Sequence, residues 1–440
     1  MKSLLPSKLY NKNFILLWQG QLVSQLGSQA SAIALMLGLK HLTQSASLIG
    51  TMLMGIAISS IVIGPLAGVV ADLFSRKWIM VITDLVSGVF LLGLSSLLLL
   101  GIGSTQLVVA AMVITELVVA TTRLFFSSAI TASIPSLVPA QQLTSANSII
   151  TSTSTFVWLV GNGLGGILFT LLGAPLLFLL DGLSYLVSGL ASLFLQVPPI
   201  GSVHSVQRVT LKGIWATLIE GLHYLWQRVE LRVLVLVKMT SSFFIAPLEV
   251  IFPFIVEDYL HLSAEWYGFF MAAMGVGSLL GLGAAGFLKV NQPWKGRLMI
   301  GVILLEAVPL LLLGLVTQPY VILGLLVVVG ACSSYVGMQL MSLLQLSTPS
   351  ELRGRMVGNF LTLTAVLMPL SLALTGLLVD LVGQRLNLIL LGCGLMIGLT
   401  QVPLVLNKSF LAFLDRSFSE PIQDKSLDKE EVAAMEMPLK

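Results

Sequence analysis

The sequence predicts an all-α membrane protein whose twelve transmembrane helices form two six-helix repeats. Only 10% of its 440 residues are charged and 56% are hydrophobic, whereas soluble domains carry roughly 25% charged residues. Apolar runs of about 20 residues recur along the chain, and each can cross a bilayer core of roughly 30 Å. These runs lack the ten-residue alternation of barrel strands, so helices are the expected spanning form.

The apolar runs divide the chain into two bundles and two further segments. We expect an N-terminal six-helix bundle at 1–196, a cytoplasmic linker at 197–231, a C-terminal bundle at 232–406 and a cytoplasmic tail at 407–440. The expected spans are 14–38, 47–71, 78–101, 106–129, 144–171, 174–196, 232–257, 264–288, 297–316, 319–346, 355–380 and 384–406.

The linker and the tail have different compositions. Apolar residues recur at helical spacing over 211–229, which predicts an amphipathic helix on the cytoplasmic membrane face, with a soluble linker helix as the alternative. The tail is charged and poor in aromatic residues, so we expect it to be disordered.

Lysine and arginine predict the orientation. With both termini in the cytoplasm, cytoplasmic segments hold 19 of these residues and the outer loops hold only Lys40 and Arg385. Such an excess marks the cytoplasmic side. The loop around Glu257, Asp258 and Glu265 is acidic and falls on the outer side. The expected location is the cell inner membrane.

The two halves resemble each other at a constant offset. Pro139 and Pro349, Gly166 and Gly376, and Gly173 and Gly383 are each 210 residues apart. A constant offset at separate places indicates two six-helix repeats of the same orientation, an arrangement that builds rocking transporters.

The loop between the second and third spans has a recognisable pattern. A glycine is followed four residues later by an aspartate and then by a basic pair. This pattern resembles the signature loop of the major facilitator superfamily, although leucine and serine stand where the family commonly has arginine and glycine. The resemblance implies a latch between the halves on the cytoplasmic side, closing against the start of span eleven. The expected latch residues are Gly68, Asp72, Arg76, Lys77, Asp84, Arg353 and Arg355.

Other segments are similar to one branch of that superfamily, the enterobactin exporters and macrolide-efflux proteins. The resemblance covers roughly residues 10–405 and implies export of small amphipathic molecules, drugs or siderophores, by proton antiport. It implies no cofactor, and we expect a monomer. A lysophospholipid flippase with the same fold is the alternative. The segments are Asn13–Gly27, Ile134–Pro139 with Leu143 and Ala146-Asn147, Glu220–Trp226 and Glu351–Arg355.

Four ionisable residues fall inside apolar spans, where a charge costs several kcal/mol. Glu116 and Arg123 lie in the fourth span, and Lys238 and Glu249 in the seventh. The resemblance places the first, fourth, seventh and tenth spans around a central cavity, so these residues are expected to face it. Arg123 follows Glu116 by seven residues, which puts both on one helix face.

Glu116 is the first candidate for carrying the coupling proton. An apolar cavity favours the neutral form of a carboxyl group, and an approaching cation favours the charged form. Arg123 is expected to tune this balance or to hold an anionic substrate, and Glu249 is the second candidate. The alternative is a structural ion pair between the halves, such as Glu116 with Lys238.

Uncharged polar residues complete the expected cavity. Trp18, Gln21 and Gln25 lie on one face of the first span, and Tyr335 and Gln339 lie in the tenth. Contact with substrate and interhelical hydrogen bonding are equally expected roles for the first-span group. Asp181 and Glu306, in the sixth and ninth spans, are expected to be peripheral packing or interface groups.

Several kinds of protein are excluded by the sequence. No basic stripe with interleaved aromatic residues indicates nucleic-acid binding. No nucleotide-binding loop, hydrolase motif or spaced Cys/His cluster indicates an enzyme or a metal site. Three GxxxG spacings predict close helix crossings rather than phosphate loops; they are Gly64/Gly68, Gly161/Gly165 and Gly277/Gly281.

Overall fold

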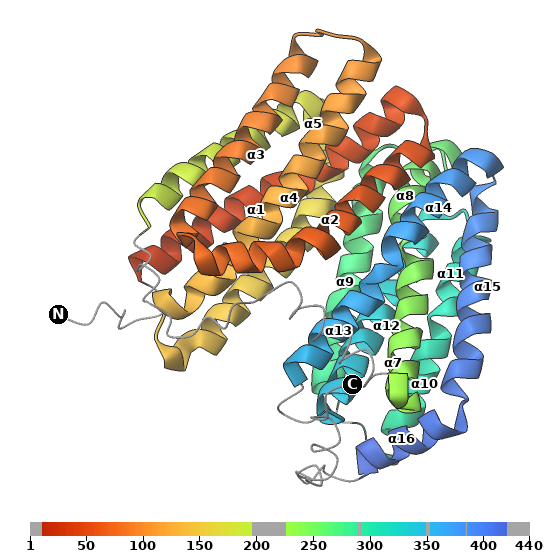
Figure 1. Ribbon diagram of the computed structural model, residues 1–440. Coiled ribbons are helices and arrows are strands. Elements are labelled where there is room, and N and C mark those ends of the chain that lie inside the picture. The colour runs from red at the N-terminus through yellow and green to blue at the C-terminus, as the bar shows by residue number, and fades with distance from the viewer. Residues whose placement is uncertain are drawn as a thin grey trace, which may run out of the picture. The chain divides into compact units, whose positions relative to one another are not determined.

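The computed structural model (Figure 1) consists of helices throughout the residues that it describes. The chain divides into two compact units. The first unit joins the described residues up to 195 to Pro247–Gly275 and Pro369–Leu386, and the second unit holds the remaining described residues. The described residues are 11–195, 226–288, 290, 292–348, 353–383 and 385–419. The predicted linker helix at 211–229 lies almost entirely outside them.

Polar side chains fix where the first helices begin. The side chains of Asn11, Ser45 and Ser104 each accept a hydrogen bond from a backbone N–H in the first turn, which satisfies one of the free donors at a helix N-terminus. The helices of this half are α1 (Lys12–Thr43), α2 (Ala46–Leu73), α3 (Arg76–Leu99), α4 (Thr105–Leu137), the short η1 (Ala140–Gln142) and α5 (Leu143–Leu193).

The 51-residue helix α5 is two spans joined at a break. Gly173 has φ 73° and ψ 167°, a conformation that glycine adopts without strain, and Pro175 follows it. Eleven helices are long and apolar enough to cross a membrane within the described residues. Because α5 counts twice, this set confirms the predicted twelve spans.

The helices of the second half break beside prolines. Helices α7, α8 and η2 together make one span, and breaks also occur between α10 and α11 and between α13 and α14. Pro247, Pro309 and Pro369 each follow such a break within three residues, because proline lacks the N–H that would bond to the preceding turn. The elements are α7 (Val229–Ile245), α8 (Pro247–Phe254), η2 (Ile255–Tyr259), α9 (Glu265–Phe287), α10 (Gln292–Leu305), α11 (Ala307–Leu313), α12 (Pro319–Leu346), α13 (Arg353–Val366), α14 (Met368–Val382), α15 (Leu386–Val405) and α16 (Lys408–Ser419).

Helix α16 corrects the prediction that the tail is disordered from residue 407. Lys408–Ser419 is helical, and Phe410 and Leu414 are buried in the apolar core of the second unit. The prediction used the average composition of residues 407–440, which does not reveal a short apolar stripe at the start of the tail.

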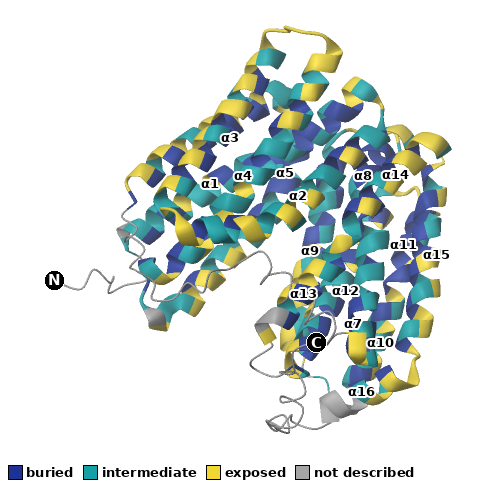
Figure 2. Ribbon diagram, in the orientation of Figure 1, coloured by how far each residue is buried: buried dark blue, intermediate teal, exposed yellow. Residues whose placement is uncertain are grey.

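The predicted repeat has a counterpart in the backbone. Gly173 and Gly383, 210 residues apart, both have positive φ values, of 73° and 60°. Both therefore use the left-handed conformation that favours glycine. Exposed positions recur along the helices (Figure 2), and many of them are large apolar residues, as expected for surfaces in contact with lipid.

Two of the three predicted glycine crossings are confirmed. A β-carbon at Gly165 would lie 3.2 Å from Cα of Ala30 on α1, and one at Gly281 would collide with the backbone oxygen of Ala331 on α12. The prediction is wrong for Gly64 and Gly68, where no described atom lies within 4 Å of the β-carbon position.

These contacts predict opposite effects for two glycines on α9. Gly281→Ala is expected to destabilise the protein by roughly 1–3 kcal/mol, because a backbone oxygen cannot move aside as a side chain can. Gly283→Ala is the matched control, since its β-carbon position is open and alanine favours a helix by up to about 1 kcal/mol. Thermal unfolding in detergent measures both, and equal melting temperatures would contradict the crossing.

Candidate functional site

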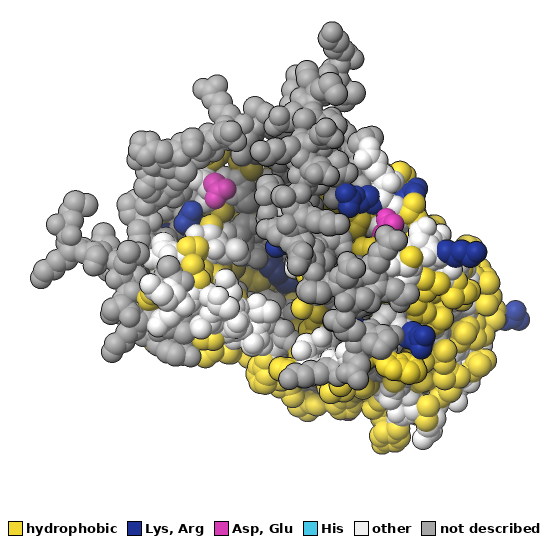
Figure 3. All heavy atoms as spheres, turned by 90° about the horizontal axis from the view of Figure 1, so that it is seen from below, with side chains coloured by type: hydrophobic (Ala, Val, Ile, Leu, Met, Phe, Trp, Pro, Cys, Tyr) yellow, Lys and Arg dark blue, Asp and Glu magenta, His cyan; other side chains and the backbone are white. Residues whose placement is uncertain are grey.

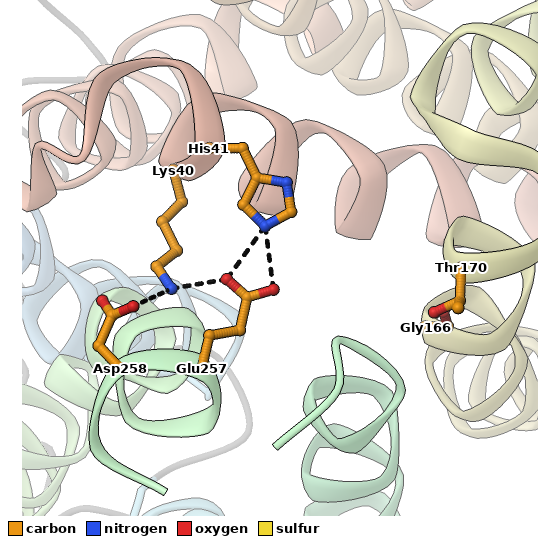
Figure 4. Close-up of polar contacts among 6 residues, drawn as sticks. All are labelled: Lys40, His41, Gly166, Thr170, Glu257 and Asp258. Atoms are coloured by element: carbon orange, nitrogen blue, oxygen red, sulfur yellow. Dashed lines mark hydrogen bonds and ion pairs between the residues drawn. The ribbon is translucent and has the colours of Figure 1, made fainter. Parts of the chain in front are cut away.

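The described ion pairs gather at the end of α1 (Figure 4). The Lys40 side chain is 1% exposed, and its Nζ donates to Glu257 Oε2 at 2.6 Å and to Asp258 Oδ1 at 2.8 Å. His41 Nε2 lies 3.0 Å from both carboxylate oxygens of Glu257. We call these four residues the Lys40 cluster. A buried lysine needs such partners, and the two neighbouring carboxylates of η2 supply them.

The carboxylate of Asp380, also in the first unit, accepts hydrogen bonds from the N-terminus of α2. Asp380 on α14 accepts hydrogen bonds from the backbone N–H of Ala46 at 2.8 Å and of Ser47 at 3.0 Å, and from Ser45 Oγ at 3.1 Å. A carboxylate at a helix N-terminus satisfies free donors and complements the helix dipole.

Glycines bring the backbones of the same elements together. A β-carbon at Gly50 on α2 would lie 3.1 Å from Cα of Gly376 on α14, and one at Gly268 on α9 would lie 2.6 Å from the backbone oxygen of Asn162 on α5. Two matching crossings, α2 with α14 and α5 with α9, therefore join the halves of the sequence within the first unit.

The candidate proton carrier lies in a polar network within the first unit. Arg123 on α4 is within electrostatic range of Glu116, Asp181 and Tyr185. Ser28 on α1 places its Oγ 3.0 Å from the Tyr185 hydroxyl and 3.4 Å from Asp181 Oδ1. Glu116 is half-buried and Arg123 exposed, and neither forms an ion pair within 4 Å in the described part of the chain.

Asp181 packs between helices, which is one of the roles predicted for it. It is 1% exposed, and its contact with Ser28 joins α5 to α1. It also lies within electrostatic range of Arg123, which the sequence did not predict.

The uncharged cavity candidates have mixed environments. Trp18 Nε1 donates to Thr153 Oγ1 at 2.8 Å, and Gln21 and Gln25 are half-buried. Tyr335 belongs to the apolar core of the second unit. Gln339 lines a cavity of about 390 Å³ within that unit; other residues that line it are Lys295, Ser342 and Arg353. Substrate contact by these residues stays a prediction.

The two seventh-span candidates fall in different units. Glu249 on α8 belongs to the first unit, is half-buried and lies within electrostatic range of Tyr267 on α9. Lys238 on α7 belongs to the second unit, where its Nζ lies 3.4 Å from Ser333 Oγ. The alternative pairing of Glu116 with Lys238 would join the two units and stays an alternative.

The basic pair of the signature loop donates to backbone oxygens of two other helices. Arg76 Nη1 donates to the backbone oxygen of Ala132 at 2.7 Å, and Lys77 Nζ donates to that of Leu193, the last residue of α5, at 2.5 Å. At the end of α5, Lys77 satisfies a carbonyl group that has no partner in the last turn. Lys and Arg predominate over Asp and Glu among the described side chains on one end of the molecule (Figure 3).

The other predicted latch residues take no part in the contacts of Arg76 and Lys77. Asp72 is exposed, whereas Asp84 is 1% exposed and lies against Gly189 on α5, inside the bundle. The predicted contact of the loop with Arg353 and Arg355 would join the two units and stays a prediction. Arg353 begins α13 and is exposed.

Twelve apolar spans in two repeats, with buried polar networks, define a multi-pass membrane transporter. A family model described as a transmembrane secretion effector matches residues 4–431. The chain belongs to this family of the major facilitator superfamily, and it is not an enzyme.

Similar proteins are efflux transporters. The chain is 26% identical over 383 residues to macrolide efflux protein A of Streptococcus pyogenes, covering 84% of this chain and 90% of that protein. It is 26% identical over 327 residues to the multidrug efflux pump Tap of Mycolicibacterium fortuitum, covering 72% and 77%. These relatives identify the chain as an efflux-type transporter of small molecules in a bacterial cell membrane.

Solved structures agree on the fold. A bacterial homologue of the iron transporter ferroportin superimposes with a TM-score of 0.68 at 17% identity, covering 91% of this chain and all of that one. A D-xylose–proton symporter superimposes with a TM-score of 0.62 at 17% identity, covering 87% and 96%. At these identities the likeness establishes the fold alone.

The Lys40 cluster gives a stability prediction. Lys40→Met is expected to cost about 1–3 kcal/mol, because it leaves two neighbouring carboxylates without their buried cation. Arg385→Met is the matched control, since Arg385 is exposed and exposed charges contribute little. Melting temperatures in detergent compare the two, and an unchanged value for Lys40→Met would show that the cluster contributes nothing.

Proposed function

We propose that the protein exports small amphipathic molecules in exchange for protons, by alternating access. The observation that carries this proposal is the network around Glu116 and Arg123. An acidic group and a cation on one face of an apolar helix are costly at bilayer depth, and transporters use such groups to bind ions.

In this mechanism Glu116 holds the proton. Its neutral form suits the apolar surroundings, and Arg123 lowers the cost of releasing the proton because it stabilises the carboxylate. Glu249, on α8 of the same unit, is the second candidate carrier. The resemblance to the signature loop supports a latch that closes the cytoplasmic side when the outer side is open.

The Lys40 cluster and Asp380 would act as the closure on the outer side. Most lysine and arginine residues fall in the segments expected to be cytoplasmic, which supports placing the Lys40 cluster and Asp380 on the outer side. Opening that side requires Lys40 to leave its carboxylates and Asp380 to leave the start of α2, so the closure would hold one of the two states of the transport cycle.

The relatives support an amphipathic drug, such as a macrolide, as substrate, and siderophores are the second class to test. We further propose that both termini are cytoplasmic and that the monomer is the transporting unit. The alternative substrate is a lysophospholipid, and a transport screen with both kinds of compound distinguishes it from an amphipathic drug.

The first test uses inverted membrane vesicles with an imposed pH gradient. Glu116→Gln is expected to abolish gradient-driven uptake of a radiolabelled macrolide, because glutamine cannot carry the proton. Exchange of labelled for unlabelled macrolide without a gradient should persist. Glu230→Gln, at the start of α7, is the control. Full gradient-driven transport by Glu116→Gln would refute the role, and transport of lysophospholipid but no macrolide would refute the substrate class.

The second test traps the closure. In a background with Cys332 and Cys393 replaced by alanine, Ser45→Cys and Asp380→Cys are combined, since these side chains lie 3.1 Å apart. A short bifunctional maleimide is expected to join α2 to α14 and to stop transport in proportion to the cross-linked fraction. Each single-cysteine variant, treated in the same way, should keep its activity. Undiminished transport by the cross-linked protein would contradict alternating access through this closure.

A further inference from the structure

The second unit contains a fully buried cluster of three polar side chains from different helices. Glu306, between α10 and α11, Ser241 on α7 and Gln401 on α15 each have 0% exposure. Ser241 Oγ donates to Glu306 Oε2 at 2.5 Å, and Gln401 Nε2 lies 3.1 Å from the same oxygen and 2.8 Å from Ser241 Oγ. One carboxyl oxygen of Glu306 therefore receives all the donors of the cluster.

The two other oxygens of the cluster lack a donor. Glu306 Oε1 and Gln401 Oε1 are buried, and no described residue donates to either. An ionised carboxylate and an amide oxygen are both acceptors, so neither can satisfy the other. Leaving a buried charged oxygen without a donor costs more than leaving a neutral one.

A proton on Glu306 would add the donor that the cluster lacks. The protonated carboxyl group has an O–H donor on Oε1, and Gln401 Oε1 is an acceptor in the same cluster. The amide N–H of Gln401 already donates to the carboxyl group. A protonated Oε1 of Glu306 would bring a donor to a cluster in which the amide oxygen of Gln401 lacks one.

Lys238 makes such a proton exchangeable. It lies on α7 one turn before Ser241, within electrostatic range of Glu306 but not within 4 Å in the described structure. Its side chain is only half-buried. Cys332 on α12 is also within electrostatic range of Glu306. Lys238 thus places a cation near the cluster without forming an ion pair with Glu306 in the described structure.

We propose that Glu306 is a proton-binding site, with the proton held on Oε1 and shared with the amide oxygen of Gln401. In the binding step the carboxylate takes up one proton from water and becomes neutral, while Lys238 keeps its charge. This site lies in the second unit, apart from Glu116. Its use in transport rests on the proposed proton coupling, whereas proton binding itself can be measured without any substrate.

The experiment is infrared spectroscopy of the full chain in proteoliposomes at neutral pH, with the carboxylic-acid C=O band as the readout. Wild type minus Glu306→Gln is expected to show the loss of one carboxylic acid per chain. Gln401→Leu removes the acceptor and is expected to move the Glu306 band to higher frequency. Glu230→Gln, at the start of α7, is the matched control, because it should leave the Glu306 band unchanged.

Two results would overturn the proposal. An identical carboxylic-acid band in wild type and Glu306→Gln would show that Glu306 is ionised. Loss of the band on adding NaCl at constant pH and ionic strength, with choline chloride as the reference, would show that the cluster binds a sodium ion instead. Because neither measurement involves transport, a failure here is distinct from a failure of the Glu116→Gln uptake test.

Discussion

The cost of a charge at bilayer depth governs the arrangement of polar groups in both units. Asp181 and Glu306, within the spans, are each 1% exposed or less, and each has polar partners contributed by other helices of its own unit. Water is scarce at this depth, so protein groups must take over its role in hydrogen bonding. The positions of these few residues therefore restrict which helix faces can pack together more strictly than the apolar surface does.

Two of the boundaries between the units fall at helix breaks that prolines create. The boundary before Pro247 is the start of α8, and the boundary before Pro369 lies one residue after the start of α14, whereas α9 is divided after Gly275 without a break. One span thus contributes its two parts to different units, and the proline marks the point of division. Glycine crossings such as Gly50 with Gly376 join the detached parts to helices of the N-terminal half by backbone contact, which leaves no side chain that can adapt to a shifted position.

The sequence predicted the spans well because apolar length and proline or glycine breaks are local signals. The break at Gly173 and the crossing at Gly281 belong to this class. The pairing of Lys40 with Glu257 was not predicted, although all of these residues fell in the expected outer loops, because a pair 217 residues apart depends on tertiary packing. The proximity of Asp181 to Arg123 was not predicted for the same reason, since helix number does not determine which face of a helix points inward. At Gly68 a GxxxG spacing was wrongly taken to require a neighbour.

The two units have a common electrostatic design, which bears on how protons can be exchanged. In the first unit Arg123 lies near Glu116, and in the second Lys238 lies near Glu306, in both cases beyond ion-pair distance in the described structure. A direct buried ion pair would hold the carboxylate charged, and a carboxyl group without any cation would stay neutral. For Glu116, an intermediate separation from Arg123 makes the two protonation states closer in free energy. Small displacements of either helix can then decide whether the proton is bound, which is the property that coupling to a conformational change requires.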